Sequence, residues 1–222
     1  MADALWDYCP NHLCAVVRSP AIDAGADLSG DGVTTDQRGF DRPQGNGFDI
    51  GAHEARFDFG DAPTATQSGF ANSYPTQTSD GAAVHNSIGP RLGADRDAES
   101  DGQPNANATG DDNGDRDDED GVAIANSGFL TRGDSHSVSI DLQSPDAVSN
   151  RLDAWIDFDQ DGSWESGEQI FDSFDLGTTS GFQDLSFAVP EDAATGLTYA
   201  RFRVTTAGGI QPTGAAADGE VE

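Results

Sequence analysis

Apolar and polar residues alternate with a period of two through the C-terminal part of the chain. The apolar members of the four clearest runs are Val138, Ile140 and Leu142; Leu152, Ala154, Ile156 and Phe158; Leu185, Phe187 and Val189; and Ala200, Phe202 and Val204. Such alternation predicts strands with one buried face. Turn signals rich in glycine, proline and aspartate separate the runs, so the pattern predicts an antiparallel β-sandwich rather than alternating strands and helices.

The distribution of large apolar side chains divides the chain into three parts. Leu, Ile, Val and Phe account for 23 of residues 122–210, but for only 6 of residues 57–121. Only the C-terminal part therefore has enough of these side chains for a hydrophobic core. We expect short extended pieces and turns in residues 1–56, a linker rich in small polar residues in 57–120, and the sandwich in 121–222.

Charge narrows the choice of partners. The 222 residues carry 40 acidic and 11 basic side chains, a formal net charge of −29, and every basic residue is an arginine. Nucleic acids and anionic lipids are bound by clustered cations, so we expect neither as a partner. No apolar run approaches the roughly 18 residues of a membrane-spanning helix. A polyanion of this kind suits divalent cations or, alternatively, a high-salt environment.

The stretch from Asp157 to Glu168 has the spacing of a calcium-binding loop, D-x-D-x-D-G followed by five residues and Glu. Calcium is a hard cation that takes about six to eight oxygen ligands. The predicted ligands are the carboxylates of Asp157, Asp159 and Asp161, the main-chain carbonyl of Ser163, Glu165 directly or through water, and a bidentate Glu168. The alternative is a hairpin turn with solvated acids. The strand predicted directly before the loop argues against an EF-hand.

A weaker set of the same kind lies in the predicted linker. Asp97, Glu99, Asp101 and Asn105 occupy positions 1, 3, 5 and 9 of a calcium-loop spacing. The alternative is a disordered acidic linker, because residues 95–120 carry eleven acidic side chains against two arginines. Without a metal, that block repels itself and is expected to be extended and mobile.

Several motifs occur in order along residues 58–222. They are Asp58-Phe59-Gly60-Asp61-Ala62-Pro63, Leu92-Gly93-Ala94, Asp118-Glu119-Asp120-Gly121-Val122, the stretch from Trp155 to Ile170, Tyr199-Ala200-Arg201-Phe202-Arg203-Val204, Pro212-Thr213-Gly214 and Asp218-Gly219-Glu220-Val221-Glu222. Together they resemble the GEVED domain with its usual leader, which is found in large secreted and cell-surface bacterial proteins. The resemblance implies a β-sandwich at an extracellular or cell-surface location. It also implies a closing strand after Glu222, so that the domain is truncated here.

An earlier group of motifs resembles a second family. The motifs are Ser19-Pro20-Ala21-Ile22-Asp23-Ala24-Gly25, Asp36-Gln37-Arg38-Gly39-Phe40 with Arg42-Pro43, and Asp49-Ile50-Gly51-Ala52-His53-Glu54. They are similar to the closing motif of choice-of-anchor Q proteins, which are right-handed parallel β-helix surface proteins. The resemblance implies that residues 1–56 are the remnant of a β-helix cut from a longer chain, because a solenoid end needs neighbouring rungs.

No combination of residues predicts a catalyst, since the four histidines lie in unrelated contexts and no G-x-S-x-G serine is present. We interpret the chain as an all-β, non-enzymatic, calcium-stabilised module with a structural or adhesive role. Surface glycans or other surface proteins are the partners that this role implies. The alternatives are an accessory region of a polysaccharide-active enzyme, and a carbohydrate-binding sandwich using Trp155 or Trp164. Of these two tryptophans, we expect one in the core and one at the surface.

Overall fold

The fold is nearly all β. A computed structural model describes residues 6–9, 12–15, 19–44, 46–96, 98–110, 120–145 and 148–222, the first two ranges by their backbone alone. The helices in these residues are short: α1 (Ala65–Ser68) and the 3-10 helices η1 (Ser29–Asp31), η2 (Thr78–Asp80) and η4 (Ala125–Gly128). The prediction of an all-β chain is confirmed.

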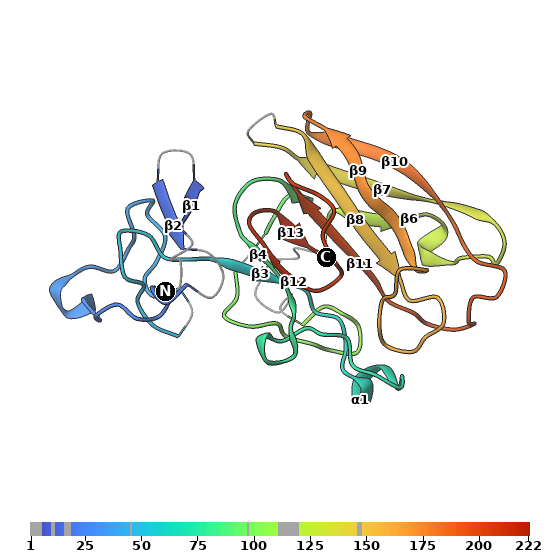
Figure 1. The fold of residues 1–222 in the computed structure, drawn as a ribbon, viewed down its shortest axis with the longest axis horizontal. Coiled ribbons are helices and arrows are strands. Elements are labelled where there is room, and N and C mark those ends of the chain that lie inside the picture. Colours follow the sequence, from blue (N-terminus) through green and yellow to red (C-terminus); the bar gives the residue numbers. More distant parts are fainter. Residues whose placement is uncertain are drawn as a thin grey trace.

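Two antiparallel four-stranded sheets pack face to face (Figure 1). One has the order β10-β7-β5, with β6 also paired to β7, and the other has the order β13-β11-β8-β9. Their strands are β5 (Arg91–Leu92), β6 (Val122–Ile124), β7 (Ser135–Gln143), β8 (Asn150–Ile156), β9 (Gln169–Gly177), β10 (Gly181–Ala188), β11 (Ala200–Thr205) and β13 (Glu220–Val221). This is the sandwich that the alternation predicts, with β5 added from the middle segment.

The hydrophobic core lies between the inner faces of the two sheets and contains the residues of the period-two pattern. Ile140 and Leu142 of β7, Leu152 of β8 and Val204 of β11 are completely buried. Leu152 lies directly opposite Val204 in the β8–β11 ladder, so both point to the same side of their sheet. Burying one such side chain on folding contributes about 1.5–3 kcal/mol to the free energy of unfolding. The core therefore fixes the register of these strands.

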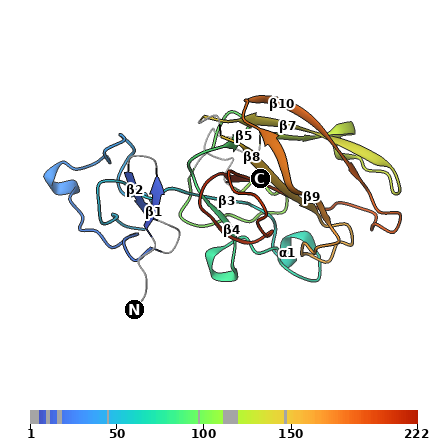
Figure 2. The same cartoon turned by 45° about the horizontal axis from the view of Figure 1, so that its top comes forward.

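The outer face of the β13-β11-β8-β9 sheet is covered by the middle segment (Figure 2). This segment and a late strand form a small sheet of β3 (Phe57–Phe59), β4 (Ala83–Asn86) and β12 (Gly214–Ala216), in which β4 pairs parallel to β12. Phe59, Tyr74 and Val84 are buried. The described part of the middle segment thus packs on the sandwich, which differs from the expected linker without a core. Residues 111–119 of the acidic block lie outside the described residues.

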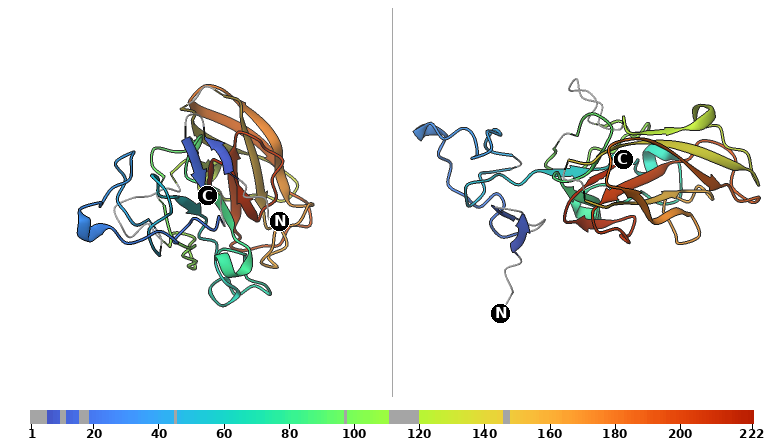
Figure 3. Two further views of the ribbon diagram at one scale, coloured as in Figure 1. Left: turned by 60° about the vertical axis from the view of Figure 1, so that its left-hand side comes forward. Right: turned by 90° about the horizontal axis from the view of Figure 1, so that it is seen from above.

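The N-terminal part is joined to the rest of the molecule by the chain that leads into β3 (Figure 3). Its residues 19–56 are held by buried carboxylates: Glu54 accepts hydrogen bonds from the Arg42 guanidinium at 2.5 Å and from the Asp49 N–H at 3.1 Å. The described residues of this stretch form turns and η1 but no strand of a β-helix. Strands β1 (Trp6–Cys9) and β2 (His12–Ala15) make a separate antiparallel hairpin. The β-helix remnant stays a prediction.

Candidate metal site

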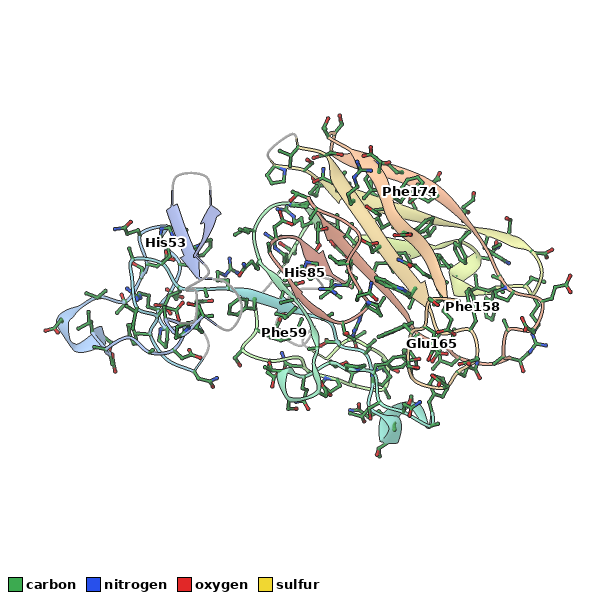
Figure 4. All side chains as sticks on the ribbon, viewed as in Figure 1. His53, Phe59, His85, Phe158, Glu165 and Phe174 are labelled. Carbon is green, nitrogen blue, oxygen red and sulfur yellow. The ribbon has the colours of Figure 1, made fainter. Side chains whose placement is uncertain are left out.

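The acidic loop connects β8 to β9 at one end of the sandwich, where Figure 4 labels Phe158 and Glu165. Its two ends are tied together, because the Ile156 N–H donates to the Glu168 carbonyl at 3.1 Å. Asp157 is tied to the segment just before β11 in the same way, by a hydrogen bond of 3.0 Å from its N–H to the Tyr199 carbonyl. The loop turns at Gly162, whose φ of +90° suits glycine.

The fold brings the five predicted carboxylates of the loop together. They form two overlapping groups of three, and within each group one oxygen from every residue lies within 4.8 Å of the others. The groups are Asp157, Asp159 and Asp161, and Asp159, Glu165 and Glu168. Ser163 links them, since its hydroxyl oxygen lies 2.7 Å from Asp161 Oδ1 and also within hydrogen-bonding distance of Glu165 Oε1. In the described residues, no other three acidic, histidine or cysteine side chains converge this closely.

Backbone N–H groups hold these carboxylates in place. Asp157 Oδ1 accepts from the Gln160 N–H at 2.6 Å, and Asp159 Oδ1 accepts from the Asp161 N–H at 3.1 Å. Glu168 spans the loop: its Oε1 accepts from Phe158 at 2.6 Å and its Oε2 from Glu165 at 3.1 Å. A carboxylate has about four lone-pair sites, so each can accept these bonds and still bind a cation.

The electrostatics of the loop favour a cation. Burial, followed by the hydrogen bond to the Glu165 side chain, raises the pKa of Glu168 to about 7. Partial loss of solvent and the neighbouring Asp161 carboxylate raise the pKa of Asp159. None of the salt bridges among the described residues reaches the loop acids. The cluster could hold a metal ion, and its all-oxygen donor set fits a hard cation.

The weaker set in the middle segment does not converge in this way. Asp97 lies outside the described residues. Glu99 Oε2 accepts from the Phe59 N–H at 3.0 Å, whereas Asp101 Oδ1 accepts from the Thr78 N–H at 2.6 Å. Asn105 Oδ1 binds its own turn, accepting from Thr109 at 3.2 Å. Glu99 and Asp101 thus tie separate parts of the fold together, whereas Asn105 stabilises its own turn.

Both tryptophans of the motif are buried, which corrects the expectation that one lies at the surface. Trp155 is 2 % exposed and Trp164 is 7 % exposed. The Trp164 ring stacks on Tyr74 at a centroid distance of 4.2 Å, and the Arg201 guanidinium lies 4.3 Å from its centre. The physical reason is the middle segment, which covers this face of the sheet. Neither indole can stack on a glycan in this arrangement.

Sequence reasoning missed two residues that contact the loop, Asn72 and Tyr74. The Tyr74 hydroxyl donates to Asp157 Oδ2, and burial together with this bond raises the pKa of the hydroxyl. Asn72 donates to the Asp161 carbonyl. They precede their partners by 83 and 89 residues and match no metal-binding spacing. No signal in a single sequence could have found them.

The strands beside the loop carry the remaining C-terminal motifs. β13 pairs with β11 through Arg203–Val221 and Val204–Glu220, next to the strand that leads into the acidic loop. Residues 151–222 match the model of the GEVED domain. The matched GEVED region comprises 72 of the 222 residues and runs from β8 through the loop to β13. It does not include residues 19–54, the part that resembles a β-helix end.

The GEVED domain is a module of bacterial surface proteins and belongs to a non-catalytic family. Searches of curated proteins and of solved structures found no match to the chain. Among the described residues, no helix has the length and apolar character needed to cross a bilayer.

Proposed function

We propose that the loop from Asp157 to Glu168 binds one calcium ion and that the protein is a calcium-stabilised, non-enzymatic module of an extracellular or cell-surface protein. The observation that carries the proposal is the convergence of five carboxylates on the connection between β8 and β9, where no arginine of the described residues forms an ion pair with them. The GEVED match supports the surface-protein role. A structural or adhesive function follows from that role, with surface glycans or other surface proteins as partners.

The choice of calcium rests on the donors. Carboxylate and carbonyl oxygens suit calcium and magnesium, whereas zinc and copper sites use histidine and cysteine. Magnesium demands a near-ideal octahedron and keeps several waters, whereas calcium accepts six to eight ligands in a flexible shell. Five protein carboxylates and a main-chain carbonyl in one loop favour the larger ion. Extracellular modules bind calcium at about 10⁻⁴–10⁻³ M, which sets the affinity that we expect.

Calcium binding should stabilise the sandwich through its register. β8 leads directly into the loop, and its Leu152, Ala154 and Ile156 face the core. Relief of the carboxylate repulsion would therefore act on one of the two interior strands of the sheet. Ligand linkage adds about 2.7 kcal/mol to the free energy of unfolding at a hundredfold excess over Kd.

The test is the melting temperature of the full chain in calcium and in chelator. Asp159→Ala should lose most of the calcium-dependent rise, because Asp159 belongs to both groups of acids and is exposed enough for the variant to fold. Glu168→Gln should do the same while keeping an acceptor for the Phe158 N–H. Glu191→Gln is the control, since Glu191 is an exposed acid outside the loop.

Molar KCl separates a specific site from general salt adaptation. Monovalent salt screens charge over about 3 Å at 1 M and has no preferred position in the loop. Millimolar calcium should therefore stabilise the wild type far more than molar KCl. If the two salts act equally, or if the loop variants respond to calcium like the wild type, the loop is an acidic turn and the proposal is wrong.

A further inference from the structure

The acidic loop rests against a segment that lies outside the GEVED match, residues 70–76, which follow α1 in Figure 1. Asn72 makes the first part of this contact. Its N–H donates to the Asp161 carbonyl at 2.8 Å, and its side-chain Nδ2 donates to the same carbonyl at 3.0 Å and to Asp161 Oδ2 at 3.3 Å. One residue of the middle segment thus holds both the backbone and the carboxylate of a predicted ligand.

Tyr74 makes the second part of the contact, at the other end of the ligand series. Its side chain is 1 % exposed, and its hydroxyl donates to Asp157 Oδ2, a carboxylate that is completely buried. The Gly162 N–H donates to the same oxygen at 3.0 Å. The Tyr74 ring stacks on Trp164 within the loop, so the tyrosine is itself fixed in position.

The close approach of residues 70–76 to the acidic loop explains why the loop has a glycine at position 162. A Cβ atom at Gly162 would lie 2.2 Å from the Asn72 carbonyl oxygen, a distance that only the absence of a side chain permits. The sharp turn and the contact with the middle segment therefore demand glycine at the same position.

We propose that Asn72 and Tyr74 are positioning residues of the calcium site, so that calcium binding and the docking of residues 70–76 on the sandwich stabilise each other. This inference rests on the proposed function. The loop in this protein is flanked by strands, and the middle segment takes the place of the helices that would brace an EF-hand loop. The residues of the GEVED match alone then hold the ligands but lack the groups that orient two of them.

Removing a residue that hydrogen-bonds to a metal ligand and orients it typically lowers metal affinity by about 10–100-fold. The expected losses of calcium affinity in the two variants follow from this range. Tyr74→Phe should weaken calcium binding by about tenfold, because the ring still packs on Trp164 while Asp157 Oδ2 loses its side-chain donor and keeps only the Gly162 N–H. Asn72→Ala should weaken binding to a smaller degree, since the backbone bond to Asp161 remains. Coupling is reciprocal, so calcium must lower the equilibrium constant for opening of residues 70–76 by the factor that their docking adds to calcium affinity.

The experiment is titration calorimetry of the full chain with calcium chloride, combined with amide exchange in calcium and in chelator. Tyr199→Phe is the matched control, because it removes a hydroxyl from the same aromatic cluster that bonds to the Ala106 carbonyl rather than to a loop acid. We expect it to bind calcium like the wild type. The Asn72 amide should exchange more slowly in calcium, whereas the Gly25 amide, bonded to Phe48 in the N-terminal part, should not change.

The outcomes separate this inference from the function on which it rests. A purely structural role of Tyr74 would lower the melting temperature equally in calcium and in chelator and would leave Kd unchanged. Wild-type affinity in both variants, or the same loss in Tyr74→Phe and Tyr199→Phe, would overturn the inference while the calcium site stands. So would an Asn72 amide that is insensitive to bound calcium. Absence of calcium binding by the wild type would overturn both.

Discussion

The two faces of the β13-β11-β8-β9 sheet are both buried, but by different chemistry. The inner face is apolar, and the outer face carries charges and aromatic rings. Inner residues are Leu152, Ala154 and Ile156 of β8 with Phe202 and Val204 of β11; outer residues are Asp153 and Trp155 of β8 with Arg201 and Arg203 of β11. The alternating strands thus have two different interfaces. The inner one depends on non-directional apolar contact, whereas the outer one requires a segment whose polar groups lie at the right positions.

Arg203 shows how the outer face depends on correctly placed polar partners. Arg203 donates to the carbonyls of Gln211, Thr213 and Gly214 and to His85 Nε2. Burial lowers the pKa of Arg203 to about 10, so the group is still charged at neutral pH. A buried cation is tolerated because these fixed acceptors replace its water. Hydrophobic contact is tolerant of sequence, whereas this polar contact depends on where each acceptor lies.

Of the two faces of this sheet, the inner one should show the larger effect of a single change. Leu152→Ala removes a completely buried side chain and leaves a cavity, which should lower the free energy of unfolding by about 2–5 kcal/mol. Urea unfolding followed by intrinsic fluorescence measures the loss. A loss below about 1 kcal/mol would mean that the two sheets are not packed as described.

The next largest loss of stability is expected from a change on the outer face. Arg203→Met keeps much of the volume but leaves the buried His85 Nε2 without its donor and removes charged hydrogen bonds to three main-chain carbonyls. A hydrogen bond to a charged group contributes about 1.5–3 kcal/mol. We expect a loss of about 3 kcal/mol. Arg151→Met is the control, because Arg151 on β8 is one-third exposed in its ion pair with Asp175 and should contribute less than about 1 kcal/mol. Equal effects of the two substitutions would contradict the covered outer face.

The outer face should also be sensitive to acid through His85, which is completely buried. Desolvation, followed by the charge of Arg203, holds the pKa of His85 well below 6.5. As the pH falls below about 6.5, the unfolded chain takes up a proton that the folded histidine does not, so stability falls with decreasing pH. One such proton accounts for at most about 1.4 kcal/mol per pH unit.

His85→Gln removes this titration and keeps an acceptor within reach of Arg203. The fall in stability between pH 6.5 and 5 should be shallower in the variant than in the wild type when both are measured by urea unfolding. Identical slopes would show that His85 is accessible to protons in the folded state.

The smallest effect is expected where a strand of the sandwich faces solvent. Phe182 of β10 is 78 % exposed, whereas Phe187 of the same strand is 5 % exposed in the core. Phe182→Ser should change the free energy of unfolding by less than about 0.5 kcal/mol, and Phe187→Ala should lower it by about 3–5 kcal/mol. A large effect at Phe182 would indicate that this surface is covered in solution.

The sandwich and the loop could be predicted from sequence because both signals are local. Alternation over a few residues is enough to assign Val138, Ile140 and Leu142 to one face of a strand. The loop spacing places its acids within one turn of chain, so their convergence follows from the chain's own geometry. The structure confirms the β character of the chain and brings the loop acids together, while the identity of the ion stays a prediction.

The packing of the middle segment could not be predicted from sequence, because its contacts are long-range and polar. Its few large apolar residues suggested a linker, yet Asp58 Oδ2 accepts from the Val221 N–H at 2.8 Å, across 163 residues. Glu220 similarly accepts from the Leu92 N–H, across 128 residues. Such bonds replace hydrophobic burial and leave no periodic pattern behind.

The sequence is enough to predict the strands of the sandwich, the inward direction of their apolar residues and the acids of the loop, since each depends on neighbours within a few residues. What covers the second face of the sheet, and which groups brace the loop, depends on how distant segments pack in the folded molecule. Arg203 reads as a polar residue of an alternating strand, and Tyr74 as an isolated aromatic in a polar stretch. Their roles arise where segments distant in the chain meet, and hydrogen bonds between such segments follow from the positions of atoms rather than from the order of residues.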